Sequence, residues 1–252
     1  MTSLPAPVDF SFDGMVAVVS GGASGIGAAI GAAYAAQGAT VVLLDRDGDA
    51  AAGAASDIGA RSVSCDVADR ESVRSAVDSV IADFGHVDVL VNSAGVARLA
   101  PAEDLSDDFW NLTIDVNLTG TFLMCQEFGR AMLERGSGRI VNIASQAATV
   151  AIEEHAAYCA SKFGVLGLTK VLAAEWAGRG VTVNTISPTV VMTPLGREAW
   201  SNPKGDALRA RIPVGRFAET HDVTSVAVFL ASPGAAMING ADILVDGGYT
   251  IL

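Results

Sequence analysis

The sequence lacks the features that mark membrane proteins and secreted proteins. Half of its 252 residues are hydrophobic, yet no apolar run reaches the roughly 18 residues that a membrane-spanning helix requires. Residues 1–7 contain no basic region followed by an apolar core, which a secretory signal needs. A membrane partner is therefore not expected, and a cytoplasmic location is predicted.

Cysteine and histidine are too few and too scattered to indicate a disulfide or a metal centre. Cys65, Cys125 and Cys159 form no CxxC pair and are expected to be reduced thiols. The three histidines lack the spacing of metal ligands. The residue pattern thus predicts no metal-binding side chains.

Positive charge is also scarce. Lysine and arginine number 16 against 28 aspartates and glutamates, so the formal net charge is −12. Such an acidic chain repels the phosphate backbone of nucleic acids and the surface of anionic membranes. A small-molecule substrate is expected, and a nucleic-acid partner is not.

Short apolar runs alternate with longer alanine-rich segments of helical character. The runs are continuously apolar, as in parallel strands covered on both faces; they occupy residues 16–20, 40–45, 62–67, 87–92, 139–144, 181–186 and 242–245. This pattern predicts an α/β chain with one Rossmann-type, doubly wound domain over residues 1–252, built on a seven-stranded parallel sheet with helices on both faces. Residues 192–213, rich in proline, glycine and charge, are predicted to form a mobile substrate lid.

One predicted helix, residues 157–177, is apolar around much of its circumference. Its apolar residues include Phe163, Val165, Val171 and Trp176. A surface helix of a monomer shows one polar face, so we expect this helix to be buried on two sides, against the sheet and against another subunit. An ordinary core helix with a wide apolar stripe is the alternative. Because homo-oligomers are mostly symmetric, a dimer or a tetramer built as a dimer of dimers is predicted.

A glycine-rich loop, Ser20-Gly21-Gly22-Ala23-Ser24-Gly25-Ile26-Gly27, joins the first predicted strand to a helix. Its glycines permit a tight turn and the close approach of a pyrophosphate, and the helix N-terminus offers free N–H groups. Asp45 ends the second predicted strand. A carboxylate there accepts hydrogen bonds from the adenine ribose and repels a 2′-phosphate, which favours NAD, with NADP as the second choice. The alternative role of Asp45 is to cap the next helix.

Tyr158 and Lys162 are four residues apart and therefore share one face of a helix. A phenol has a pKa near about 10 and is a poor base at neutral pH. An ammonium about 4 Å away stabilises the phenolate by roughly 4 kcal/mol at an effective dielectric constant of about 20, equivalent to about three pKa units. Tyr158 is therefore expected to have a lowered pKa and to accept a proton.

These motifs, taken in order, resemble the short-chain dehydrogenase/reductase family over nearly the whole chain. The glycine loop is similar to the family's TGxxxGIG, Asn92-Ser93-Ala94-Gly95 to its NNAG, and Val245-Asp246-Gly247-Gly248 to its last strand. Pro188-Thr189-Val190-Val191-Met192-Thr193 resembles its nicotinamide segment PGxIxT, and Cys65-Asp66-Val67 its adenine-binding segment. Thr189 stands in place of the family's glycine, and Ser93 in place of its second asparagine.

The resemblance implies hydride transfer between an alcohol or carbonyl carbon and a nicotinamide, with Asn117, Ser145, Tyr158 and Lys162 as the catalytic residues. Tyr158 would exchange the hydroxyl proton, Lys162 would tune its pKa, Ser145 would hold the reacting oxygen, and Asn117 would hold a water for proton relay. The alternatives are a strand-end cap for Ser145 and a hydrogen bond to a helix carbonyl for Asn117. The cofactor-binding residues implied are Gly21, Ser24, Gly25, Ile26, Gly27, Asp45, Arg46, Asp66, Val67, Asn92, Ala94, Gly95, Tyr158, Lys162, Pro188, Val191 and Thr193.

The sequence constrains the substrate less tightly. Substrate contacts are expected from Ser145, Ala147, His155 and Tyr158, and polar groups here suit a substrate with several hydroxyls; a solvated loop is the alternative for His155. Residues 92–99 and 246–250 resemble the galactitol and threitol type of polyol dehydrogenase. Some of those relatives carry a structural divalent ion near the chain end, but no carboxylate cluster establishes one here.

The predicted reaction converts a secondary alcohol, in first place a polyol, to its ketone with NAD. A 3-oxoacyl-carrier-protein reductase, an apolar-alcohol dehydrogenase of the hydroxysteroid type and a catalytically silent NAD-binding protein are the alternatives. Asp45 and the net charge of −12 weigh against the first, because it would need NADPH and a basic docking surface.

Overall fold

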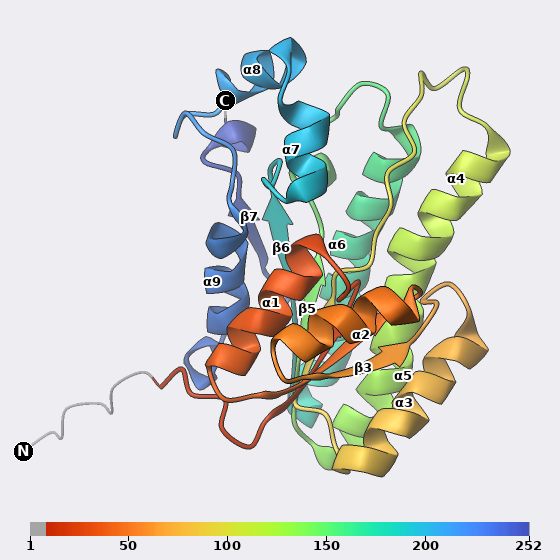
Figure 1. The fold of residues 1–252 in the computed structure, drawn as a ribbon, viewed down its shortest axis with the longest axis vertical. Coiled ribbons are helices and arrows are strands. Elements are labelled where there is room, and N and C mark those ends of the chain that lie inside the picture. The colour runs from red at the N-terminus through yellow and green to blue at the C-terminus, as the bar shows by residue number, and fades with distance from the viewer. Residues whose placement is uncertain (1–8, 252) are drawn as a thin grey trace, which may run out of the picture.

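Seven parallel strands form one sheet in the order β3-β2-β1-β4-β5-β6-β7 in the computed structural model, which describes residues 9–251 (Figure 1). The strands are β1 Val16–Ser20, β2 Thr40–Asp45, β3 Arg61–Ser64, β4 Val89–Asn92, β5 Gly138–Ile143, β6 Val181–Pro188 and β7 Asp242–Val245. The strand order reverses between β1 and β4, and ligands of such sheets bind beyond the carboxyl ends of the strands at that point. The predicted fold class is confirmed.

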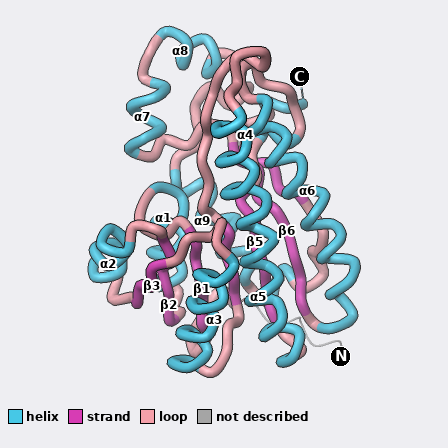
Figure 2. The backbone as a smooth tube through the Cα atoms, turned by 90° about the vertical axis from the view of Figure 1, so that its right-hand side faces the viewer, coloured by secondary structure: helices cyan, strands magenta, loops and turns pink. Residues whose placement is uncertain are grey.

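Helices cover both faces of the sheet (Figures 1 and 2). They are α1 Gly25–Ala36, α2 Gly48–Asp57, α3 Arg70–Phe84, α4 Asp107–Ile114, α5 Gly120–Arg135, α6 Ala156–Trp176, α7 Pro194–Trp200, α8 Pro203–Arg209 and α9 Thr220–Ala231. The apolar residues of α1, α2 and α9 share one core with the sheet, and those of α3, α5 and α6 share another.

Side-chain alternation in the strands divides the two cores. In β1, Val16 and Val18 belong to the core beneath α3, α5 and α6, whereas Ala17 and Val19 belong to the core beneath α1 and α9. Every residue of β1 is buried. Because a fully buried valine contributes about 1.5–3 kcal/mol, both faces of the sheet are stabilised by the same short apolar run.

The predicted helix over residues 157–177 is α6, and the first, second and seventh predicted strands match β1, β2 and β7. The strand predicted over residues 62–67 ends earlier, at Ser64, because its partner strand β2 ends at Asp45; the Cys65 N–H makes the last bond to β2, to the Asp45 carbonyl at 2.8 Å. The predicted lid segment folds into α7 and α8, which stand above the carboxyl ends of β6 and β7 (Figure 1). Its mobility stays a prediction.

Within residues 9–251, no helix is both long enough and apolar enough to cross a membrane. Residues 1–7, on which the expected absence of a secretory signal rests, lie outside the described part of the chain. The cytoplasmic location therefore stays a prediction.

Candidate active site

The four residues predicted to be catalytic come together at the carboxyl edge of β4 and β5. Tyr158 and Lys162 lie on the first turns of α6, and Ser145 follows β5 directly. Asn117 reaches the same place from the segment that joins α4 to α5, where its amide nitrogen donates to the Ser161 hydroxyl at 3.1 Å. A strand end and two helices thus place four polar side chains around one point.

Lys162 and Tyr158 lie close together. The Lys162 Nζ atom is 5.7 Å from the centre of the Tyr158 ring and donates to the Ile143 carbonyl at 2.8 Å. The Lys162 side chain is buried, and burial lowers its pKa to about 8. The ammonium therefore lies close to the phenol ring, and its lowered pKa brings the loss of its charge nearer to neutral pH.

The prediction that the Tyr158 pKa is lowered is wrong when only the groups of the protein act on it. Burial raises the pKa of the Tyr158 phenol, and a hydrogen bond with Ser145 only partly opposes that effect. The physical reason is that removing the phenolate from water costs more than the neighbouring polar groups return. The positive ring of an oxidised nicotinamide would supply further stabilisation when bound.

Ser145 is oriented by the turn that it begins. Its Oγ accepts a hydrogen bond from the Ala147 N–H at 3.1 Å, and this caps the 3-10 turn Gln146–Ala148. The hydroxyl proton remains available to an oxygen beside Tyr158. Ser145 thus takes the alternative capping role, and its catalytic role, which this geometry permits, stays a prediction. The Ala147 N–H positions Ser145, and the predicted contact of Ala147 with substrate stays a prediction.

Asn117 lies in a π-helical segment, Asp115–Thr119, between α4 and α5. Such segments hold one residue more than an α-helical turn and are frequent at functional sites. The Asn117 Oδ1 atom accepts from the Val96 N–H at 2.8 Å, and Nδ2 donates to the Val96 carbonyl at 2.9 Å. Asn117 therefore fixes the loop after β4 onto α6. Its predicted water-holding role stays a prediction.

The substrate side of the site is a wall made by the turn after Ser145 and the loop that leads into α6. His155 stacks edge-to-face on Tyr158 with ring centres 6.0 Å apart. Its Nδ1 bonds the Glu153 carbonyl at 2.6 Å; because a carbonyl only accepts, Nδ1 carries a proton, and Nε2 of the neutral ring can accept a hydrogen bond. Glu154, in the same loop, is the one non-glycine residue of the described chain with a positive φ, 65°.

Gln146 belongs to this wall but was not among the predicted site residues. Its side chain is 4% exposed, and its Oε1 atom has no hydrogen-bond partner within residues 9–251. Buried polar atoms are nearly always paired. An unpaired amide oxygen next to Ser145 therefore indicates a place for a ligand hydroxyl. In the sequence, only its position directly after Ser145 could have indicated a functional role for Gln146.

The glycine loop has the shape that a pyrophosphate requires. Ser24, the residue before α1, makes no capping hydrogen bond, so the first N–H groups of α1 keep their capacity for an anion. Gly21 has φ +66°, and a Cβ on it would lie 2.8 Å from the Ala94 backbone. A Cβ on Gly25 would enter the space facing the Thr193 methyl at 3.6 Å. The chain thus fits a dinucleotide at the β1–α1 turn.

Asp45 stands beside this loop at the end of β2. Its Oδ2 accepts from the Ala23 N–H at 3.2 Å, and Asp47, not Asp45, caps α2 by accepting from Ala50. The alternative role of Asp45 as a helix cap is therefore excluded. A carboxylate at the end of this strand hydrogen-bonds the adenine ribose in this fold, and that contact of Asp45 stays a prediction.

The remaining predicted cofactor contacts line the same edge of the sheet. The Ser20 hydroxyl accepts from the N–H groups of Ser93 at 3.2 Å and Ala94 at 3.4 Å, which joins the glycine loop to the segment after β4. Asn92 is buried and holds Asn142 of β5 through Nδ2 at 2.8 Å, so it supports the sheet beneath the crevice. Its predicted contact with cofactor stays a prediction, as do those of Arg46, Asp66, Val67, Pro188 and Val191.

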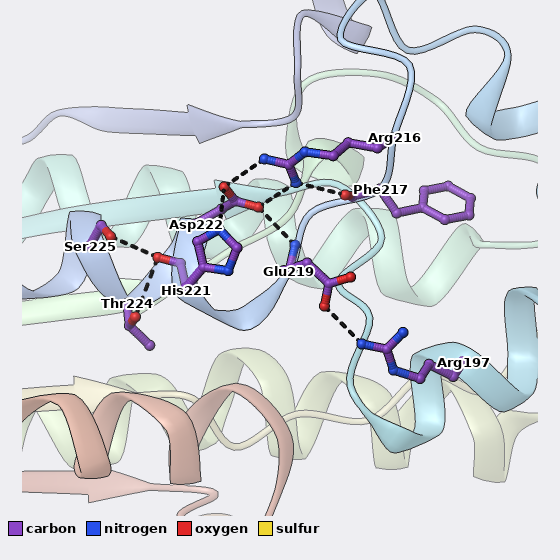
Figure 3. A network of polar contacts seen from close by, with 8 residues as sticks. All are labelled: Arg197, Arg216, Phe217, Glu219, His221, Asp222, Thr224 and Ser225. Atoms are coloured by element: carbon purple, nitrogen blue, oxygen red, sulfur yellow. Dashed lines mark hydrogen bonds and ion pairs between the residues drawn. The ribbon is translucent and has the colours of Figure 1, made fainter.

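The lid segment is tied down on two sides. Figure 3 shows Arg197 of α7 paired with Glu219 at 2.9 Å, and Glu219 in turn donating its N–H to Asp222 at 2.8 Å. Arg216 donates hydrogen bonds to Asp222 from both terminal nitrogens, and this hydrogen bonding lowers the pKa of Asp222 to about 2. On the other side, Lys204 of α8 lies 3.5 Å from Glu154. These contacts join the lid to the start of α9 and to the substrate wall.

Within the described residues, no three His, Cys, Asp or Glu side chains gather into a group that could hold a metal ion. Asp246, the carboxylate near the chain end, accepts instead from Gly248 at 2.9 Å and from Thr250 at 2.7 Å. A structural ion near the chain end therefore finds no support in this geometry.

Comparison with known proteins agrees with this arrangement. A family model described as Enoyl-(Acyl carrier protein) reductase matches residues 21–250. The chain is 60% identical over 253 residues to the D-threitol dehydrogenase of Mycolicibacterium smegmatis, covering 98% of this chain and 97% of that protein. It is 44% identical to the NAD-dependent glycerol dehydrogenase of Listeria innocua, with 96% of each chain covered. It is also 42% identical to the galactitol 2-dehydrogenase (L-tagatose-forming) of Cereibacter sphaeroides, covering 96% and 97%.

The fold has close relatives among solved structures as well. A short-chain type dehydrogenase/reductase from Mycobacterium marinum superposes with a TM-score of 0.91 at 32% identity, covering 97% of this chain and 98% of that one. Fold, catalytic geometry and sequence relatives agree: the chain belongs to the short-chain dehydrogenase/reductase family and is an oxidoreductase that acts on CH–OH groups.

Proposed function

We propose that this enzyme oxidises a secondary hydroxyl of a small polyol to the ketone with NAD as the hydride acceptor. The observation that carries the substrate class is the buried, unpaired Oε1 of Gln146 beside Ser145. A site with buried hydrogen-bonding groups selects for substrates that carry matching hydroxyls. The threitol, glycerol and galactitol dehydrogenases to which the chain is similar support the same class.

The chain's own residues divide the work of the reaction. Alcohol oxidation removes one hydride and one proton from the substrate, and the bound nicotinamide supplies the hydride acceptor. Tyr158 takes the hydroxyl proton as phenolate, so the alcohol oxygen becomes the carbonyl oxygen. The Ser145 hydroxyl donates to that oxygen while its charge develops. Lys162 holds positive charge under the phenol, which favours the deprotonated form.

The substrate proposal is tested with the purified enzyme and a panel of alcohols. Tetritols, pentitols and hexitols should reduce NAD with kcat/KM at least about 10-fold above that of 2-butanol, because the latter lacks the hydroxyls that pair with the wall. NADH formation measures the rates. Equal rates for polyols and 2-butanol would contradict the proposal, and activity confined to acyl thioesters with NADPH would favour a 3-oxoacyl-carrier-protein reductase.

Asp45 carries the proposed preference for NAD. Replacing it with asparagine removes the charge that repels a 2′-phosphate, and the ratio of kcat/KM for NAD to that for NADP should fall by about 10- to 100-fold. Parallel kinetics with the two cofactors measure the ratio.

Asp47→Asn is the matched control, because it removes one charge two residues away and asparagine still caps a helix. The control should leave the ratio unchanged. An unchanged ratio in Asp45→Asn, or an equal change in both variants, would remove Asp45 from cofactor selection.

The acyl-carrier-protein alternative is disfavoured by charge. A carrier protein is acidic and needs a basic surface, whereas this chain has a net charge of −12. The apolar-alcohol alternative is disfavoured by the unpaired polar atom in the substrate wall. The silent-protein alternative conflicts with the complete set of Asn117, Ser145, Tyr158 and Lys162.

The outer face of α6 supports a homo-oligomer, for which we propose the predicted dimer of dimers. Val165, Leu172 and Trp176 are buried against the sheet, whereas Phe163 is 50% and Val171 53% exposed. Phe109 and Trp110 of α4 are also exposed. Exposed apolar side chains on neighbouring helices mark a protein interface. Light scattering that gives the mass of a single 25.7 kDa chain would refute the proposal.

A further inference from the structure

Thr189 carries a buried hydroxyl that the protein leaves unpaired. The residue follows the end of β6, and its N–H donates to the Val245 carbonyl at 3.1 Å. Its side chain is 7% exposed, yet its Oγ1 has no hydrogen-bond partner within residues 9–251. A hydroxyl removed from water without a partner costs free energy, so its retention calls for a partner from outside the chain.

The row of hydroxyl residues in β6 shows where that partner must come from. Alternate residues of a strand face the same side, and Val183 belongs to the core beneath α6. Thr185 and Ser187 continue the row, and both donate to Asp242 Oδ1, at 2.8 and 2.6 Å. Thr189 is the next member, beyond the reach of that carboxylate, at the open edge of the sheet. The first two hydroxyls are satisfied internally and the third is not.

Thr189 is at the level of the catalytic serine. Ile143 of β5 pairs with Ile186 of β6 in the parallel register, so Ser145 lies two residues beyond the pair and Thr189 three. The same alternation places Thr189 on the α6 face, the face of Tyr158, whereas α1 and the glycine loop cover the other face. A ligand group that meets Thr189 is therefore on the substrate side of the crevice.

We propose that Thr189 is a specificity-determining residue whose hydroxyl pairs with a hydroxyl of the polyol near the carbon that is oxidised. The inference rests on the proposed function and adds a second contact to that of Gln146. The two residues follow neighbouring strands, β5 and β6, so they flank the substrate from two sides. Together they select chains that carry hydroxyls on both sides of the reacting carbon.

The test compares two alcohols with the same four-carbon chain, threitol and 2-butanol, in Thr189→Val and Thr189→Ser. Valine keeps the branched shape and removes the hydroxyl, whereas serine keeps the hydroxyl. Thr189→Val should lower kcat/KM for threitol by about 10- to 100-fold, mainly through KM, because a substrate hydroxyl loses its partner. Its rate with 2-butanol and its affinity for NADH, measured by fluorescence titration, should not change. Thr189→Ser should retain the threitol activity.

A second variant and the stability of the free enzyme distinguish the loss of a substrate contact from damage to the fold. Thr189→Ala removes the same hydroxyl with less bulk, and the thermal midpoint of Thr189→Val should equal or exceed that of the wild type because an unpaired hydroxyl is lost. Equal losses for both alcohols, a loss of NADH affinity (which would assign the hydroxyl to the carboxamide of the cofactor) or unchanged threitol kinetics would each overturn the inference. A wild-type enzyme that ignores threitol and other polyols overturns the proposed function as well, whereas polyol oxidation unaffected by the variants overturns this inference alone.

Discussion

Tyr158→Phe should lower the turnover number for alcohol oxidation by about 10²- to 10⁴-fold, the usual contribution of a positioned proton acceptor. The variant removes one oxygen and keeps the ring that stacks on His155. The affinity for NADH should change little, because the glycine loop and Asp45, which are expected to hold the phosphates and the adenine ribose, lie on other elements. Steady-state kinetics and fluorescence titration measure the two quantities separately.

Tyr34→Phe is the matched control. The Tyr34 hydroxyl is fully buried in the core beneath α1 and α9 and donates to the Ala227 carbonyl at 3.0 Å. Its loss should reduce the free energy of unfolding by about 1 kcal/mol and leave turnover intact. Near-normal turnover in Tyr158→Phe would take Tyr158 out of the mechanism, and so would the same loss in both variants.

Lys162→Met should lower the rate of oxidation at neutral pH by about 100-fold. At 5.7 Å from the ring centre and a dielectric constant of about 20, the ammonium stabilises the phenolate by roughly 3 kcal/mol, or about two pKa units. The rising limb of kcat/KM against pH should therefore move about two units towards alkaline pH. Kinetics between neutral and alkaline pH measure the shift.

Lys162 also makes the free energy of unfolding of the wild-type enzyme depend on pH. Burial lowers the pKa of Lys162 to about 8, so its charge is present below that pH and is lost as the pH rises past it. An unfolded chain still binds this proton up to about pH 10.4. The contribution of Lys162 to the free energy of unfolding therefore rises as the pH rises between these values. Lys162→Met should abolish that gain.

Lys170→Met, an exposed lysine of the same helix, is the control for both readouts and should change neither. A profile in Lys162→Met that falls in height without moving along the pH axis would show that Lys162 supports the fold only, and would contradict its electrostatic role.

The parts of the molecule that depend on local sequence were predictable. Continuous apolar runs such as that of β1 identify strands buried on both faces, and the i, i+4 spacing of Tyr158 and Lys162 fixes their common helix face. The glycine loop is equally local, because strand, turn and helix start lie within one short stretch. These features need no knowledge of the tertiary structure.

The parts that depend on tertiary contacts were not predictable. The unpaired Gln146 and Thr189 atoms are recognised only when every possible partner is placed. The pKa of Tyr158 is raised and not lowered as predicted, because the phenol loses its surrounding water on burial, and this burial is visible only in the tertiary structure. Asn117 lies in a π-helical segment, and no residue type in that segment indicates a change in helical pitch.

The π-helical segment Asp115–Thr119 sets a limit on how this chain can vary in length. Each residue turns an α-helix by about 100°, and the π-helical segment takes up one surplus residue, so deleting one residue there would return the segment to α-helical pitch. Phe128 and Met132, which are fully buried, could then keep their places only if Asn117 left the loop after β4. The surplus residue allows Asn117 to reach the loop after β4 while Phe128 and Met132 stay buried. We therefore expect substitutions but no single-residue deletions to be accepted in this segment.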